Sequence, residues 1–194
     1  MTTIKDCFNI ILRGDKEESR LAARRVRKIL HRSQAGDGGK YDEIKEIINE
    51  APNVYAGIAE TWRQENFVTA VSVIYFLHGK ETEPDFLFPW LFQLLQHSNG
   101  YVRYAAVKMI SHELGGLTVH IRYPGEKSGF NNLSPEQAGK ILFALDMNLR
   151  GLLAGLWEPK YDRYKYIDSL PPCPYKSVQM VLAEIDDYVN FHNE

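Results

Sequence analysis

Three stretches of the sequence repeat one spacing of apolar residues that ends at a histidine. The three sets are Leu21, Val26, Ile29 and His31; Val68, Val73, Phe76 and His78; and Val102, Val107, Ile110 and His112. Each stretch matches the next at a fixed offset, first of 47 and then of 34 residues, with no gap inside it. Self-similarity at this period is typical of stacked helical repeats. The repeat therefore predicts an all-α chain in which successive helices pack side by side.

Hydrophobic periodicity and helix-end signals place helices along most of the chain. The expected helices cover residues 4–13, 16–31, 44–52, 55–63, 66–78, 84–95, 101–114, 134–158 and 175–191. Thr2 or Thr3 is expected to cap the first helix, and Ser134 followed by Pro135 is a strong helix start. The segment 66–78 has almost no polar side, so this helix is expected to be buried all round.

A single domain, 1–194, is expected, with three parts. A repeat array occupies 1–115, a long loop 116–133, and C-terminal helices 134–194. Within the loop, Leu117, Val119, Ile121 and Tyr123 alternate with polar residues, which is a short strand-like pattern. Loops of this length in compact domains are usually functional or disordered.

One segment resembles a known repeat family. HSNGYVRYAAVKMISHEL has a polar turn followed by Val102, Arg103, Ala105, Ala106 and Ile110, and it resembles the second helix of a HEAT repeat. SRLAARRVRKIL, which begins at Ser19, is similar but lacks the Val-Arg pair. The resemblance covers residues 1–115. It implies a short right-handed α-α superhelix of about three HEAT-like helix pairs, closed by a C-terminal helical pair.

Composition argues against several classes of protein. The net charge of −2 gives no general attraction to nucleic acid or to anionic membranes. Cys7 and Cys173 stand far apart and outside any metal-ligand spacing, so neither a disulfide framework nor a zinc site is expected. No apolar run is long enough to cross a bilayer, and the first residues lack a signal-peptide pattern. We therefore expect a cytoplasmic protein without a membrane segment, a metal or a cofactor.

The histidines form a possible column along one surface of the stack, which metal or an anion would occupy. Packed helices lie roughly 8–10 Å apart, whereas zinc needs each ligand at about 2.0–2.1 Å. A histidine near a helix C-terminus also has a simpler role, because the helix dipole favours a cation there. Deoxyhypusine hydroxylase, a HEAT-type di-iron enzyme, uses several His-Glu pairs, and His112-Glu113 is the one pair here. No metal centre and no catalytic residue are therefore predicted.

Charge is concentrated on one helix. Six Lys and Arg residues and no acid lie between Arg20 and Arg32. HEAT-like DNA alkylation-repair glycosylases bind DNA through a cationic concave surface, and phosphate binding needs such charge. The corresponding positions of the next stretch are Val71 and Ile74, which are apolar. A solvated helix face or a surface for an acidic protein partner is thus favoured over nucleic acid, which remains the alternative.

The predicted function is a protein-binding scaffold or adaptor. Its expected contacts are Arg24 and Arg27 on the basic helix and Arg122 and Tyr123 in the long loop, because loops on a rigid scaffold often carry binding residues. Arg103 is instead expected to serve packing, with Asn99 or Asp85 as its partner. A third possibility is an enzyme acting on a small molecule or a tetrapyrrole, as in HEAT-like phycobilin lyases, and it rests on fold analogy.

Overall fold

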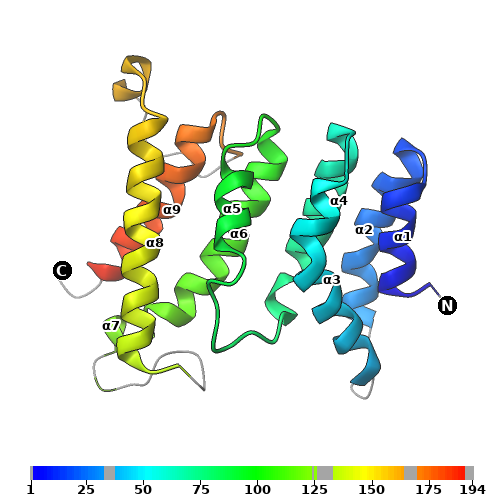
Figure 1. Ribbon diagram of the computed structural model, residues 1–194, viewed down its shortest axis with the longest axis horizontal. Coiled ribbons are helices and arrows are strands. Elements are labelled where there is room, and N and C mark those ends of the chain that lie inside the picture. Colours follow the sequence, from blue (N-terminus) through cyan, green and yellow to red (C-terminus); the bar gives the residue numbers. More distant parts are fainter. Residues whose placement is uncertain (1, 33–37, 124, 126–132, 164–169, 191–194) are drawn as a thin grey trace. The chain divides into compact units, whose positions relative to one another are not determined.

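The computed structural model describes residues 2–32, 38–123, 125, 133–163 and 170–190 (Figure 1). The regular elements over these residues are all helical, which confirms the predicted all-α class. The elements are α1 (Ile4–Arg13), α2 (Lys16–Arg32), α3 (Gly38–Ala56), α4 (Thr61–Ile74), η1 (Tyr75–Leu77), α5 (Phe88–Leu95), α6 (Gly100–Leu117), α7 (Val119–Arg122), α8 (Pro135–Gly155), η2 (Pro159–Arg163) and α9 (Pro174–Val189).

The chain divides into two compact units, which we call the N-terminal unit (Met1–Gly79) and the C-terminal unit (Lys80–Glu194). In the N-terminal unit α1 and α2 form a hairpin, and α3 and α4 pack beside it (Figure 1). In the C-terminal unit α6 packs against α5 and α9, and α8 packs against α9. Four pairs of successive helices therefore pack together: α1 with α2, α3 with α4, α5 with α6, and α8 with α9.

Two helix starts follow directly from local sequence. Thr3 caps α1 and forms a capping box with Asp6, in which each side chain accepts a hydrogen bond from the other residue's N–H. Ser134 and Gln137 form the same arrangement at α8, with Pro135 in the first turn. A capping box satisfies two backbone donors that have no partner inside the helix.

The helix boundaries predicted from Pro52 and Pro84 both differ from those observed. The expected helix end near Pro52 is wrong, because α3 continues through Pro52 to Ala56 while Ile48 and Ala51 are fully buried beside it. Burial of this face outweighs the local cost of proline. Pro84 was expected to open a helix, but α5 begins at Phe88 with its own proline in the first turn.

The expected loop at 116–133 begins later than predicted. Helix α6 continues to Leu117, and the short helix α7 occupies the region of the predicted strand-like alternation. Leu117 and Thr118 are buried, and the Thr118 hydroxyl donates to the Leu114 carbonyl at 2.6 Å. Packing and this capping bond keep the backbone helical where the residue alternation alone indicated an extended segment. Residues 124 and 126–132 lie outside the described part.

Buried residues of α2, α4 and α6 share one helical spacing. Four of them stand at i, i+3, i+4 and i+7: Ser19, Ala22, Ala23 and Val26 in α2; Phe67, Ala70, Val71 and Ile74 in α4; Val102, Ala105, Ala106 and Met109 in α6. Each set has an alanine at i+3, which leaves room for a neighbouring helix. The same spacing also fits Arg103, Ala106, Val107 and Ile110 in α6, so burial does not single out one offset between the helices.

The leucine pattern of α8 belongs to the interior of the C-terminal unit. Leu142, Leu145 and Leu149 are buried, and α8 packs against α6 and α9. Helix α9 contributes the residues that the sequence pattern predicted for its apolar face: Val178, Val181, Leu182 and Ile185. The buried part of the α8 leucine pattern therefore forms core.

Candidate binding surface on the first helical hairpin

Helix α2 has one buried and one cationic side. Ala22, Ala23 and Val26 face the core, whereas Arg24 and Arg27 are exposed, as the helical spacing predicted. Arg25 and Lys28 are exposed as well. The same helix thus anchors the N-terminal unit and presents a row of cations to solvent.

Within the described part of the chain, most of these cations form no ion pair. Arg20 pairs with Glu17, whose Oε1 lies 2.6 Å from Nη2, and this pairing lowers the pKa of Glu17. Arg24 adds a weaker favourable interaction with the same carboxylate. Among the described residues, no carboxylate forms an ion pair with Arg27 or Lys28. The positive charge of α2 is consequently available to an external group.

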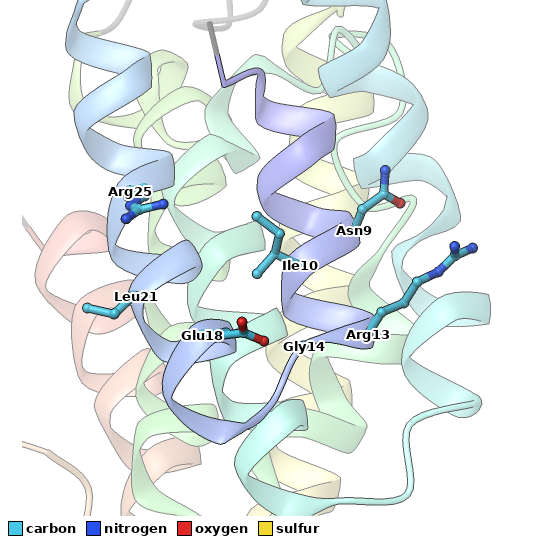
Figure 2. Close-up of a pocket in the computed structure, with 7 residues that line it drawn as sticks. All are labelled: Asn9, Ile10, Arg13, Gly14, Glu18, Leu21 and Arg25. Atoms are coloured by element: carbon cyan, nitrogen blue, oxygen red, sulfur yellow. The ribbon is translucent and has the colours of Figure 1, made fainter.

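A depression lies where α1 and α2 meet, and its volume is about 580 Å³. It is lined by Asn9, Ile10, Arg13, Gly14, Glu18, Leu21 and Arg25. Figure 2 shows Ile10 in the centre, with Asn9 and Arg13 along α1 and the remaining side chains along α2. Ligand sites commonly have volumes of roughly 300–1,000 Å³, so this depression has room for part of a ligand.

The one carboxylate in the depression has a backbone partner. Glu18 Oε2 accepts a hydrogen bond from the Asp15 N–H at 3.0 Å, and Asp15 Oδ1 accepts from the N–H groups of Glu17 and Glu18 at 2.9 Å. This exchange fixes the start of α2 and holds the Glu18 carboxylate at the Gly14 end of the depression.

The charge of Arg25, on α2, affects the pKa of a residue on α1. Burial raises the pKa of the Cys7 thiol, and the positive charge of Arg25 opposes that rise. Arg13, at the end of α1, is exposed, and among the described residues neither arginine has an ion-pair partner. Two cations from different helices therefore border the apolar centre formed by Ile10.

Contacts from α2 and α4 hold the end of α1 in place. The Ser19 hydroxyl donates to the Ile11 carbonyl at 3.0 Å and accepts from the Asn66 amide at 3.0 Å. Arg63 donates from Nη1 to the carbonyls of Ile11 and Gly14 at 3.0 and 3.1 Å. These bonds satisfy carbonyls that the helix end leaves open. Sequence reasoning did not identify Arg63, whose role depends on the placement of α4.

Arg122 and Tyr123, the two other predicted contacts, lie in the C-terminal unit at the end of α7. Arg122 donates to Thr118 Oγ1 at 3.1 Å and to the Gly115 carbonyl at 2.7 Å, and its guanidinium lies 4.8 Å from the Tyr188 ring centre. Tyr123 is 50% exposed, with Arg122 5.5 Å from its ring centre. Arg122 is thus engaged in packing, whereas the Tyr123 ring remains accessible.

Arg103 has the predicted packing role, but its partners differ from those expected. The side chain is 3% exposed and donates to the carbonyls of His97, Ser98 and Pro171 at 2.6, 2.8 and 2.5 Å. Burial lowers the pKa of Arg103. Backbone carbonyls, and not the expected Asn99 or Asp85 side chains, therefore bind this guanidinium.

The histidines of the three matched stretches occupy different environments. His78 is buried with its ring centre 5.4 Å from that of Tyr75, whereas His112 is exposed. The side chain of His31 lies outside the described part. Glu113 is fully buried while its neighbour His112 is exposed, so the two side chains point to different sides of α6. Across the described ranges, no group of three His, Cys, Asp or Glu residues could hold a metal ion.

No known protein family, curated protein or solved structure matches this chain. Over the described residues, no helix has both the length and the apolar composition needed to cross a membrane. Inference about function therefore starts from the surface of the α1–α2 hairpin.

Proposed function

We propose that this chain is a protein-binding module whose partner contacts the basic face of α2. The observation that carries the proposal is the exposure of Arg24 and Arg27 without an intramolecular ion pair among the described residues. Unneutralised charges on a rigid surface speed encounter with an oppositely charged partner and orient it. The expected partner is accordingly a protein with an acidic surface.

HEAT-like helix pairs form the scaffold in this proposal. Its support is the pairing of α1 with α2, of α3 with α4 and of α5 with α6. Shared small residues on the buried sides of α2, α4 and α6 add to that support. A cytoplasmic location belongs to the same proposal, because Cys7 and Cys173 are free thiols and a reducing compartment preserves such thiols.

Tyr123 is proposed as a second contact, and Arg122 as the residue that positions it. An exposed tyrosine beside a guanidinium suits an interface, since aromatic residues and arginine are enriched where binding energy concentrates. The bonds from Arg122 to Thr118 and Gly115 hold the end of α7 in place. Tyr123 would then meet a partner with little loss of backbone freedom.

A nucleic-acid partner has less support. The exposed cations are concentrated on α2, and the chain has a net charge of −2. Binding to a phosphate backbone neutralises several phosphates and becomes steeply weaker with added salt. One cationic helix beside a depression with an apolar centre is better suited to binding a protein surface.

Charge reversal tests the proposal. The double variant Arg24→Glu/Arg27→Glu is compared with the wild type as bait in affinity capture, and each captured protein is then purified and titrated directly. We expect at least one direct interaction to weaken by about tenfold or more, because two favourable charge contacts become repulsive.

The double variant Lys5→Glu/Lys140→Glu is the matched control. It changes the net charge equally, and both lysines are exposed and form ion pairs that contribute little to stability. Equal weakening by both double variants would reduce the effect to net charge and overturn the proposal. Unchanged affinity for every purified partner in the Arg24/Arg27 variant would also overturn it, as would binding of single-stranded RNA in preference to any protein.

A further inference from the structure

The depression between α1 and α2 combines an apolar centre with two cations, and this combination specifies a kind of ligand. We propose that it binds an extended acidic segment of the partner protein, with one apolar side chain seated on Ile10 and carboxylates beside Arg13 and Arg25. The inference rests on the proposed protein-binding function and adds the chemistry that the partner must carry.

The apolar part comes from one residue of each helix. Ile10 is half-buried between the helices, and Leu21 is 40% exposed on the same side of α2. A single exposed leucine is ordinary on a protein surface. Here Leu21 and Ile10 line the same depression among charged side chains, so an apolar side chain entering it gains contact with both.

The charged part is divided between the helices. Arg13 belongs to α1 and Arg25 to α2, and Figure 2 shows them on different sides of Ile10. Within the described part of the chain, neither has an ion-pair partner to give up on binding. A guanidinium binds a carboxylate through paired N–H donors. An acidic residue on each side of an apolar one therefore matches the arrangement.

Glu18 restricts the orientation of the segment. Its carboxylate lies at the Gly14 end, with Oε2 accepting from the Asp15 N–H. Glu18 and Arg25 are two helical turns apart on α2, which is about 10 Å. An acidic residue is consequently favoured at the Arg25 end and disfavoured next to Glu18.

The depression exists before any partner binds. A Cβ at Gly14 would lie 2.8 Å from the Ile10 carbonyl oxygen and 2.9 Å from Glu18 Oε2, so only glycine fits this tight connection. The Ser19 and Arg63 bonds to the end of α1 fix the same region. A preformed site avoids the cost of ordering a loop on binding.

A nucleic-acid strand suits the depression less well than a peptide does. Backbone binding needs several cations in sequence along the strand, whereas this site has two cations, one carboxylate and an apolar centre. A peptide supplies an apolar side chain and acidic groups at neighbouring positions. The occupant we propose is therefore a peptide segment.

Three synthetic peptides test this chemistry against the full chain by isothermal titration. The first alternates Asp or Glu with Leu, the second has Ser in place of Leu, and the third has Asn and Gln in place of the acids. We expect the first to bind at least about tenfold more tightly than either of the others, since each lacks one part of the match. Preference for a single-stranded RNA of equal length would overturn the inference.

Variants of the protein locate the binding. Arg25→Glu and Leu21→Ser should each weaken the first peptide by about fivefold or more, whereas Arg24→Glu, which changes charge outside the depression, should weaken it by less than about threefold. All three positions are exposed, so the variants keep the fold, and urea denaturation verifies this.

The outcomes separate the two proposals. Equal weakening by Arg24→Glu and Arg25→Glu would assign binding to the general charge of α2 and overturn the depression as a site. Failure of all three peptides, while Arg24→Glu/Arg27→Glu still abolishes capture of the natural partner, would overturn only this inference. Peptide binding that depends on Arg25 and Leu21, with capture unaffected by Arg24 and Arg27, would support the depression and overturn the wider α2 surface.

Discussion

Two arginines on α2 of the N-terminal unit contrast with one in α6 of the C-terminal unit. In the N-terminal unit, Arg24 and Arg27 lie exposed on α2, and among the described residues neither has an ion-pair partner. In the C-terminal unit, Arg103 is almost fully buried in α6 and donates to three backbone carbonyls. The same type of side chain is thus a buried structural donor at Arg103 and an exposed surface charge at Arg24 and Arg27.

The carbonyls near the C-terminal end of the first helix are hydrogen-bonded in the same way in both units. A serine hydroxyl donates to a carbonyl near the end of that helix, from Ser19 to Ile11 in one unit and from Ser177 to Leu95 in the other. An arginine binds carbonyls beside it, Arg63 in the first unit and Arg103 in the second. Arg63 additionally pairs with Glu60 and lies 4.4 Å from the Trp62 ring centre, whereas Arg103 relies on carbonyls.

The difference between these arginines shows that burial separates structural cations from cations available for binding. Burial with several carbonyl partners marks a structural residue, because an unpaired buried guanidinium would be very costly. Exposure without a carboxylate partner leaves charge available for recognition. Stability measurements on variants at three arginine sites can therefore test this distinction.

The largest effect is expected at Arg103. Arg103→Met leaves the carbonyls of His97, Ser98 and Pro171 without this donor, and we expect the free energy of unfolding to fall by about 3 kcal/mol. Arg103→Lys keeps a charge but not the forked geometry, so it should recover only part of the loss. Urea denaturation followed by circular dichroism measures both. A loss below about 1 kcal/mol for Arg103→Met would contradict the structural role.

An intermediate effect is expected at Arg63. The Arg63 side chain is 13% exposed, so water can replace some of its hydrogen bonds to the carbonyls when the guanidinium is removed. Arg63→Met should lower the free energy of unfolding by about 1.5 kcal/mol, through loss of the bonds to the Ile11 and Gly14 carbonyls. Equal losses at Arg63 and Arg103 in the same urea series would remove the proposed dependence on burial.

The smallest effect is expected on α2. Arg24→Glu/Arg27→Glu should change the free energy of unfolding by less than about 0.5 kcal/mol, because exposed substitutions away from packing contacts usually do. The same variant is expected to weaken partner binding strongly. Destabilisation comparable to that of Arg63→Met would show that these cations support the fold and would end the contrast between the units.

Local signals predicted some helix boundaries well. The caps at Thr3 and Ser134 were visible in sequence because both depend on residues three positions apart. The boundary at Pro52 and the helical state of 117–122 were missed, because burial against other helices outweighs the local preference there.

One part of the candidate site could be predicted from the sequence, and the other part could not. Exposure of Arg24 and Arg27 followed from the 3.6-residue period, which is a property of one helix. The depression brings together Arg13 and Arg25 from two helices, and no spacing within one segment could show that. Arg122 was singled out by its position in a loop, but the structure engages it with Gly115, Thr118 and Tyr188.

The all-α class, the cationic side of α2 and the capped helix starts could be predicted from the sequence, because each depends on residues within about two turns of one another. The burial of particular arginines, the position of the depression and the full extent of the helices are set by tertiary packing. Those properties depend on the angle and distance between helices, and the packing of distant segments sets both. The proposed binding depends on this packing, because it places the apolar side chain of Ile10 on α1 beside the charged side chains of α2.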